Sequence, residues 1–238
     1  FMPFIFIPAP ILCLLSLPFN RSASLIACLP LTIGCMLYAK HLLPQTIHAE
    51  IDETLVILTH NISRKSYDMD GLAEFLLEQN ADIITLQEVH FLAHRQDVLL
   101  EELDSTYPFS SLQPLENGID ANLTLSRFPI IAHAPLAPLE SLYTRLCVNG
   151  KVVDLYNVSL HTPIRSDTQP ITGFELLDIA LNYDDDERNR QLNALLEEID
   201  EEVPLILAGD FNLSDQTTQY EWLATNLTDS FDEAGQGM

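Results

Sequence analysis

Polar side chains recur in this sequence at the points where apolar stretches end. Asn61 follows LVILTH, Glu88 follows DIITLQ, His161 follows VDLYNVSL, and Asp210 and Asn212 follow PLILAG. Ligands and catalytic groups are commonly placed at strand ends, on loops that a rigid sheet holds in position. Carboxylates, carboxamides and an imidazole at such ends could together bind a metal ion and a phosphate group.

These residue types favour an oxygen-ligated cation over zinc. Mg²⁺ prefers carboxylate and carbonyl oxygens, whereas Zn²⁺ favours clustered His and Cys. The sequence therefore predicts Mg²⁺, with Mn²⁺ as the alternative. Taken singly, each residue also has an ordinary structural interpretation: Glu88 as a solvated strand terminus and His161 as a partly buried structural histidine.

The elements that would position these residues alternate between strands and helices. Composition predicts strands at 51–59, 82–86, 123–126, 129–134, 145–148, 152–160 and 204–208, and apolar spacing predicts helices at 70–79, 93–103, 188–200 and 216–224. Asn149-Gly150 is a strong hairpin signal between two of the strands. Because hairpins occur beside strand–helix alternation, we expect an α/β two-sheet sandwich of the α+β type. Residues 104–122 and 162–186 are expected to be loops that shape the substrate site.

Six stretches in this order resemble the endonuclease/exonuclease/phosphatase superfamily, which has the DNase I-like fold. They are LTHNI (58–62), ADIITLQEV (81–89), LSRFPI (125–130), NVSLHTP (157–163), RNRQLNALLEEI (188–199) and LILAGDFN (205–212). The resemblance spans about residues 55–237 and implies a sandwich whose active site opens at one edge.

The resemblance also implies roles for particular residues. Asn61 and Glu88 resemble the metal-binding pair, with Glu88 as the main Mg²⁺ ligand. Asp210 resembles the residue that orients or deprotonates the attacking water, while Asn212 and His161 resemble the residues that contact the phosphate. Arg127, in LSRFPI, could lie near the site and bind substrate, but a surface or structural ion pair is an equal alternative.

One departure from the family pattern lies near the C-terminus. Members of the superfamily end with a strand that carries an Asp and then a strand led by an Asp-His pair, whose histidine is catalytic. No such motif occurs in residues 213–238. We therefore expect the sequence to be truncated at its C-terminus, and this fragment to be inactive.

The first 48 residues differ in composition from the rest. Residues 1–49 contain no Asp or Glu and only Arg21 and Lys40, whereas residues 50–238 carry 9 basic and 35 acidic side chains, a net charge of −26. The uncharged runs 1–19 and 22–39 are close to the length of a membrane span, so we expect a transmembrane hairpin over 1–48 and a catalytic domain over 49–238. A buried helical hairpin in a soluble protein is the alternative. The expected location is the cell membrane, with two or more spans and an extracytoplasmic domain.

The hairpin favours one class of substrate. An enzyme tethered at a bilayer meets lipid head groups at high effective concentration, and this arrangement is similar to that of membrane-anchored bacterial members of the superfamily. We therefore expect hydrolysis of a lipid-linked phosphate, pyrophosphate or phosphodiester. An extracytoplasmic Mg-dependent nuclease is the second hypothesis, disfavoured because the domain lacks a basic stripe. A catalytically dead, membrane-tethered binding module is the third, and no protein partner is predicted.

Overall fold

The computed structural model describes most of the chain from residue 54 onward. The described residues are 54–62, 69–90, 95–115, 120–136, 139–163, 183–200 and 202–234, together with Leu29, Thr32 and Ile33. In chain order the elements are β1 (Ile57–Asn61), α3 (Met69–Glu78), β2 (Ile83–His90), α4 (Arg95–Leu103), β3 (Phe109–Pro114), β4 (Asp120–Ser126), β5 (Ile130–Leu136), β6 (Ser141–Val148), β7 (Lys151–Ser159), α6 (Asp186–Glu197), β8 (Leu205–Asp210), α7 (Thr218–Asn226) and α8 (Ser230–Ala234).

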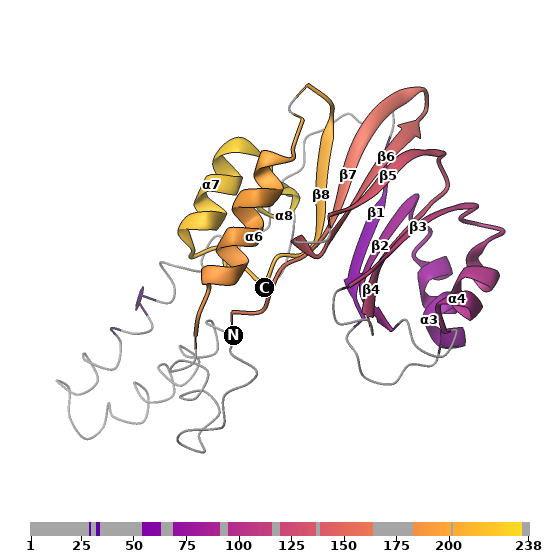
Figure 1. Cartoon of the computed structure of the whole chain (residues 1–238), viewed down its shortest axis with the longest axis horizontal. Coiled ribbons are helices and arrows are strands. Elements are labelled where there is room, and N and C mark those ends of the chain that lie inside the picture. The colour runs from indigo at the N-terminus through magenta and orange to yellow at the C-terminus, as the bar shows by residue number, and fades with distance from the viewer. Residues whose placement is uncertain are drawn as a thin grey trace, which may run out of the picture. The chain divides into compact units, whose positions relative to one another are not determined.

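Two four-stranded mixed sheets form the body of the structure. The first has the order β1-β2-β4-β3 and the second the order β5-β6-β7-β8. Strands β1 and β2 are parallel, as are β7 and β8, and the remaining neighbours are antiparallel. Contacts of β1 with β8, β2 with β7 and β4 with β6 place the sheets face to face, as Figure 1 shows.

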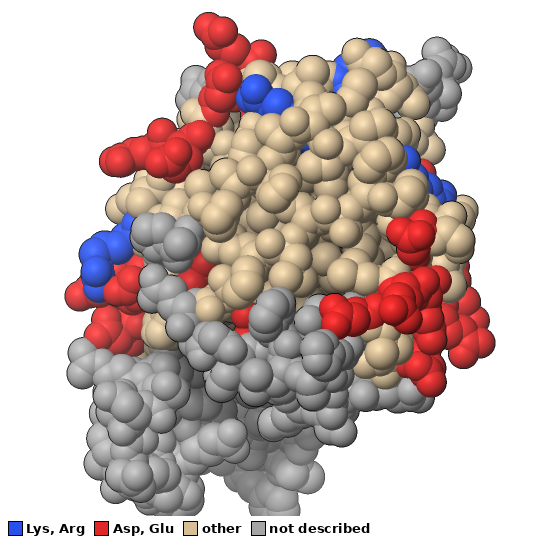
Figure 2. Space-filling view, turned by 45° about the vertical axis from the view of Figure 1, so that its right-hand side comes forward, with Lys and Arg blue, Asp and Glu red and all other residues tan. Residues whose placement is uncertain are grey.

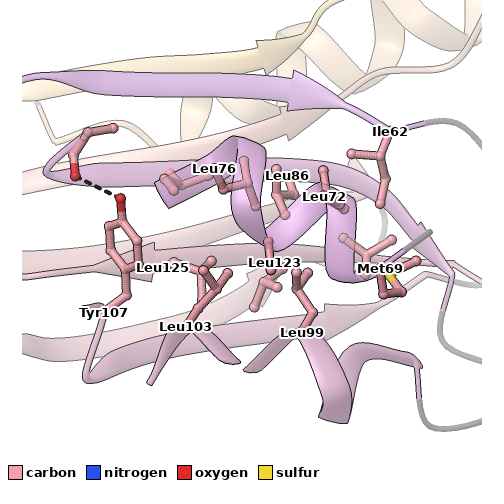
Figure 3. Close-up of a cluster of buried hydrophobic side chains, with 14 residues drawn as sticks. Ile62, Met69, Leu72, Leu76, Leu86, Leu99, Leu103, Tyr107, Leu123 and Leu125 are labelled. Atoms are coloured by element: carbon pink, nitrogen blue, oxygen red, sulfur yellow. Dashed lines mark hydrogen bonds between the residues drawn. The ribbon is translucent and has the colours of Figure 1, made fainter. Parts of the chain in front are cut away.

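Helices α3 and α4 cover the outer face of the first sheet and form the main apolar core with it (Figure 3). On β2, Ile84 and Leu86 point into this core, and on β4, Leu123 and Leu125 do the same. The Tyr107 hydroxyl donates a hydrogen bond to the Ala81 carbonyl at 3.0 Å, which satisfies its polar end inside the cluster. This core anchors β2, the strand that carries Glu88.

The space between the sheets is apolar at one end and polar at the other. Ile83, Leu146 and Leu155 pack together near the start of β2. Further along β2, the alternate positions Thr85 and Gln87 face the second sheet instead, and both are fully buried. Thr124, on β4 of the first sheet, and Thr144, on β6 of the second sheet, are buried as well. The polar end of the space between the sheets is the end at which β2 reaches Glu88.

The two-sheet α/β sandwich expected from the sequence is confirmed. The hairpin at Asn149-Gly150 joins β6 to β7, with φ of 49° and 81°, because a two-residue turn of this hand needs positive φ at both positions. One strand was not expected. Strand β3 lies in 104–122, which the sequence analysis left as a loop, and its inward Ser111 and Gln113 made it too polar to be recognised.

The predicted membrane spans, 1–19 and 22–39, lie outside the described residues except for Leu29, Thr32 and Ile33. Within the part of the chain that the structure describes, no helix has the length and apolar character needed to cross a membrane. The chain divides into two compact units, one of residues 52–219 and one of residues 1–51 with 220–238. In the second unit, the Tyr220 hydroxyl, on α7, donates to Asp229 at 2.5 Å.

Candidate active site

The carboxyl ends of four strands meet at one edge of the sandwich. Asn61 lies opposite Gln87 at the end of the parallel pair β1 and β2, and Ser159 lies opposite Asp210 at the end of β7 and β8. Strand β1 packs against β8, and β2 against both β7 and β8, so the two pairs face each other. Parallel strands present their carboxyl ends on the same side, which brings the polar residues at these ends together.

The Asn61 carboxamide joins the two acidic residues of this edge. Its Nδ2 donates to Glu88 Oε1 at 3.2 Å and to Asp210 Oδ2 at 2.9 Å. These three side chains come from β1, β2 and β8, and are separated by as many as 149 positions in sequence. Two carboxylates therefore lie beside one neutral amide in a half-buried place, which is an environment that favours a bound cation.

A β-bulge directs Glu88 toward this edge. Between the register pairs Leu86–Leu123 and Val89–Ala121, β2 contains one residue more than β4. Leu86 and Val89 both point into the core beneath the helices, so the bulge resets the alternation of the strand. Glu88 takes a positive φ of 54° and is left half-buried, whereas an uninterrupted strand would have pointed it into the apolar core.

The backbone conformations of Gly209 and Asn212 determine the turn at the end of β8. Gly209 has a φ of 144°, and a Cβ there would lie 2.0 Å from the Val158 carbonyl oxygen, so only glycine fits. The Asn212 N–H donates to Asp210 Oδ1 at 3.0 Å, forming an Asx turn with φ 48° at Asn212. Asn212 Nδ2 donates to the Leu160 carbonyl at 2.8 Å, which ties the turn to the end of β7.

Two buried side chains of helix α6 hold the loop that follows β7 and the loop that follows β8. Arg188 is 1% exposed, pairs with Asp185 at 2.8 Å and donates to the Asn212 carbonyl at 2.8 Å. Three positions along, Gln191 Oε1 accepts a hydrogen bond from the His161 N–H at 2.7 Å. The His161 residue is exposed at the end of β7. The sequence analysis assigned neither Arg188 nor Gln191 to the site, and their spacing of three on one helix was the available signal.

The structure places Arg127 away from these residues. Its guanidinium contacts Asp82 at 3.4 Å and Asn80 at 2.8 Å, and lies over the Tyr107 ring at 5.5 Å from the centroid. Asp82 precedes the first residue of β2, whereas Glu88 lies near the last. Six residue steps along the strand, roughly 20 Å, therefore separate the two positions. Arg127 thus forms a structural ion pair at the opposite end of the sheet.

A sequence model of the Endonuclease/Exonuclease/phosphatase family matches residues 58–236, which include all five candidate residues. The chain belongs to this family. Members of the family are hydrolases that act on phosphoesters, and they generally use divalent metal ions.

Solved structures agree with this fold. An endonuclease/exonuclease/phosphatase from Beutenbergia cavernae is similar with a TM-score of 0.53 and 21% identity, covering 71% of this chain and 53% of that one. A family protein from Leptotrichia buccalis has a TM-score of 0.54 and 18% identity, over 75% and 77% of the two chains. D. rerio TDP2, complexed with a single strand DNA product, has a TM-score of 0.51 and 18% identity, over 74% and 66%. The chain thus spans about half of the B. cavernae protein. No similar sequence was found among curated proteins.

The donor set of this edge fits a hard divalent cation. Within the described ranges, no three or more His, Cys, Asp or Glu side chains are grouped so as to hold a metal ion by themselves. Two carboxylates, Glu88 and Asp210, lie beside the Asn61 carboxamide. Mg²⁺ typically takes only one or two protein carboxylates and fills its other positions with water and substrate phosphate. A small set of oxygen donors is therefore what Mg²⁺ requires, and it suits Zn²⁺ poorly.

Proposed function

We propose that this chain carries the catalytic domain of a metal-dependent phosphoric-ester hydrolase. The observation that carries the proposal is the Asn61 carboxamide, which bridges Glu88 and Asp210 at the carboxyl edge of both sheets. Glu88 and Asn61 would hold Mg²⁺, or Mn²⁺ in its place. The bound cation would neutralise charge on the substrate phosphate, which is the main requirement of phosphoryl transfer.

The other residues of the edge have separate tasks in this proposal. Asp210, fixed by the Asn61 amide and by the Asn212 N–H, accepts a proton from the attacking water. The Asn212 carboxamide and the exposed His161 imidazole contact the phosphate oxygens. Water oxygen bonds to phosphorus, the bond from phosphorus to the leaving oxygen breaks, and that oxygen takes its proton from solvent, to which Asp210 then returns the proton that it accepted. Helix α6 keeps His161 and Asn212 in place through Gln191 and Arg188.

We infer that the substrate is a lipid-linked phosphate, pyrophosphate or phosphodiester. The uncharged runs 1–19 and 22–39 support this substrate class because a membrane tether would hold the catalytic domain at the lipid surface. The strong negative charge of residues 50–238 supports it indirectly, since that charge repels long polyanions.

A nuclease is the second candidate, because D. rerio TDP2, which shares the fold, was crystallised with a single strand DNA product. Figure 2 shows acidic side chains gathered in patches around a largely uncharged area, with few and separate basic side chains on that face. Nucleic-acid binders usually present a basic stripe, so this surface favours the lipid substrate. A catalytically dead binding module is the third candidate, which the presence of both carboxylates disfavours.

A substrate panel separates these candidates. The full-length protein, expressed from its own reading frame, is assayed for phosphate release from a polyprenyl pyrophosphate and for nicking of plasmid DNA, with Mg²⁺ and with EDTA. We expect Mg²⁺-dependent phosphate release that falls at least about a hundredfold in Glu88→Gln and Asp210→Asn. Lys151→Ala, at the exposed hairpin, should keep full activity. Plasmid nicking with the same metal and variant dependence would support the nuclease, and no turnover of either substrate would support the binding module.

We propose that residues 1–48 anchor the chain in the cell membrane, with the catalytic domain outside the cytoplasm. In intact cells, an added protease should then cleave residues 50–238. Cleavage only after the membrane is permeabilised would place the domain in the cytoplasm, and recovery of the protein in the supernatant after ultracentrifugation would contradict the anchor.

A further inference from the structure

We propose that Asn157 is a positioning residue that sets the Glu88 carboxylate for metal binding. The inference rests on the proposed function, because it concerns the cation that Glu88 would hold. Asn157 lies on β7 in the second sheet, is fully buried, and contacts the first sheet directly beside the bulge of β2.

Asn157 makes three hydrogen bonds across the sandwich. Its Nδ2 donates to the Leu86 carbonyl at 3.2 Å and to the Leu123 carbonyl at 3.0 Å. Its Oδ1 accepts a hydrogen bond from Gln87 Nε2 at 2.8 Å. Leu86 and Leu123 are the last register pair before the bulge, and Gln87 is the first residue within it. One side chain thus holds both strands and the residue next to Glu88.

These three hydrogen bonds, the Asn157 clamp, explain how the backbone of Glu88 keeps its conformation. A glutamate with φ 54° is strained, and such strain persists only where surrounding contacts determine the backbone. Without Asn157, two buried carbonyls would lose a donor, and Gln87 Nε2 would keep its 3.3 Å contact to the Thr59 hydroxyl alone among the described residues. The bulge would then relax, and the Glu88 carboxylate would leave the Asn61 amide.

Neighbouring polar residues in the same layer lack such contacts. The hydroxyls of Thr85, Thr124 and Thr144 are buried and have no hydrogen-bond partner among the residues that the structure describes. Thr124 is adjacent to Leu123 on β4, so Thr124→Val changes the same layer at nearly constant volume. Thr124→Val is therefore a matched control, because it removes a buried hydroxyl and keeps all three hydrogen bonds of Asn157.

The test measures Mn²⁺ affinity of the 238-residue chain by electron paramagnetic resonance, at a temperature where circular dichroism shows every variant folded. Asn157→Ala should weaken binding at least about tenfold, as loss of a group that orients a metal ligand typically does. Thr124→Val should keep the wild-type affinity. Adding Asn157→Ala to Glu88→Gln should cause no further loss, because Asn157 acts through Glu88.

The outcomes distinguish the two proposals. Wild-type affinity in Asn157→Ala, with a lowered melting temperature alone, would show that Asn157 is only structural. Absence of Mn²⁺ binding in the wild type, or equal binding in Glu88→Gln, would instead contradict the metal site itself. If Asn157→Ala does not fold, Gln87→Met removes one of the three hydrogen bonds, the one from Gln87 Nε2 to Asn157 Oδ1, and the same two results apply to it.

Discussion

At the residue scale, Asp154 illustrates how the second sheet holds a buried charge. Asp154, on β7, accepts hydrogen bonds from Arg145 at 2.7 Å and from Tyr143 at 3.0 Å, and these bonds lower its pKa below the ordinary value of 3.8. A lowered pKa stabilises the fold above 3.8, and that stabilisation is lost as pH falls through and below this value. Asp154→Asn should therefore lower the melting temperature at pH 7, by an amount that shrinks toward pH 3. Thermal unfolding at several pH values checks this, and a constant difference would contradict it.

At the element scale, the pairing of β7 with β8 depends on Gly209. Any Cβ there would overlap the Val158 carbonyl, and the residue that follows is Asp210. Gly209→Ala should destabilise the fold by at least about 2 kcal/mol, from overlap and unfavourable φ together. Gly150→Ala is the matched control, because its φ of 81° is also positive but a Cβ there meets nothing within 4 Å; it should cost about 1 kcal/mol. Urea unfolding measures both, and equal losses would refute the packing argument.

Individual elements show what could be predicted from the sequence and what could not. The Asn149-Gly150 hairpin was predictable because a two-residue turn is encoded by its own residues. Strand β3 was not, because its polar residues face a polar layer that exists only after both sheets pack. The candidate site residues were predicted from strand ends and motif order. The bulge at Glu88 was not, because it depends on Asn157, 69 positions away. The sequence left two alternatives open for Arg127, and its ion pair with Asp82 could not be predicted because it is a tertiary contact.

At the scale of the whole molecule, negative charge should limit stability. Residues 50–238 carry a net charge of −26, and such self-repulsion destabilises a compact state. Raising KCl from about 20 to 500 mM shortens the Debye length from roughly 20 to 4 Å, so the melting temperature should rise. Differential scanning fluorimetry at constant pH measures this rise, and a melting temperature that falls with KCl would show that local ion pairs outweigh the net repulsion.

We propose that Glu88 and Asn61 hold one divalent cation beside Asp210. The most direct test is the melting temperature of the 238-residue chain as MgCl₂ or MnCl₂ is added at fixed high KCl. A cation that binds only the folded state raises this temperature in proportion to the logarithm of its concentration above Kd. We predict such a rise in the wild type and in Lys151→Ala, and its loss in Glu88→Gln. An equal rise in Glu88→Gln, or none in the wild type, would contradict the site.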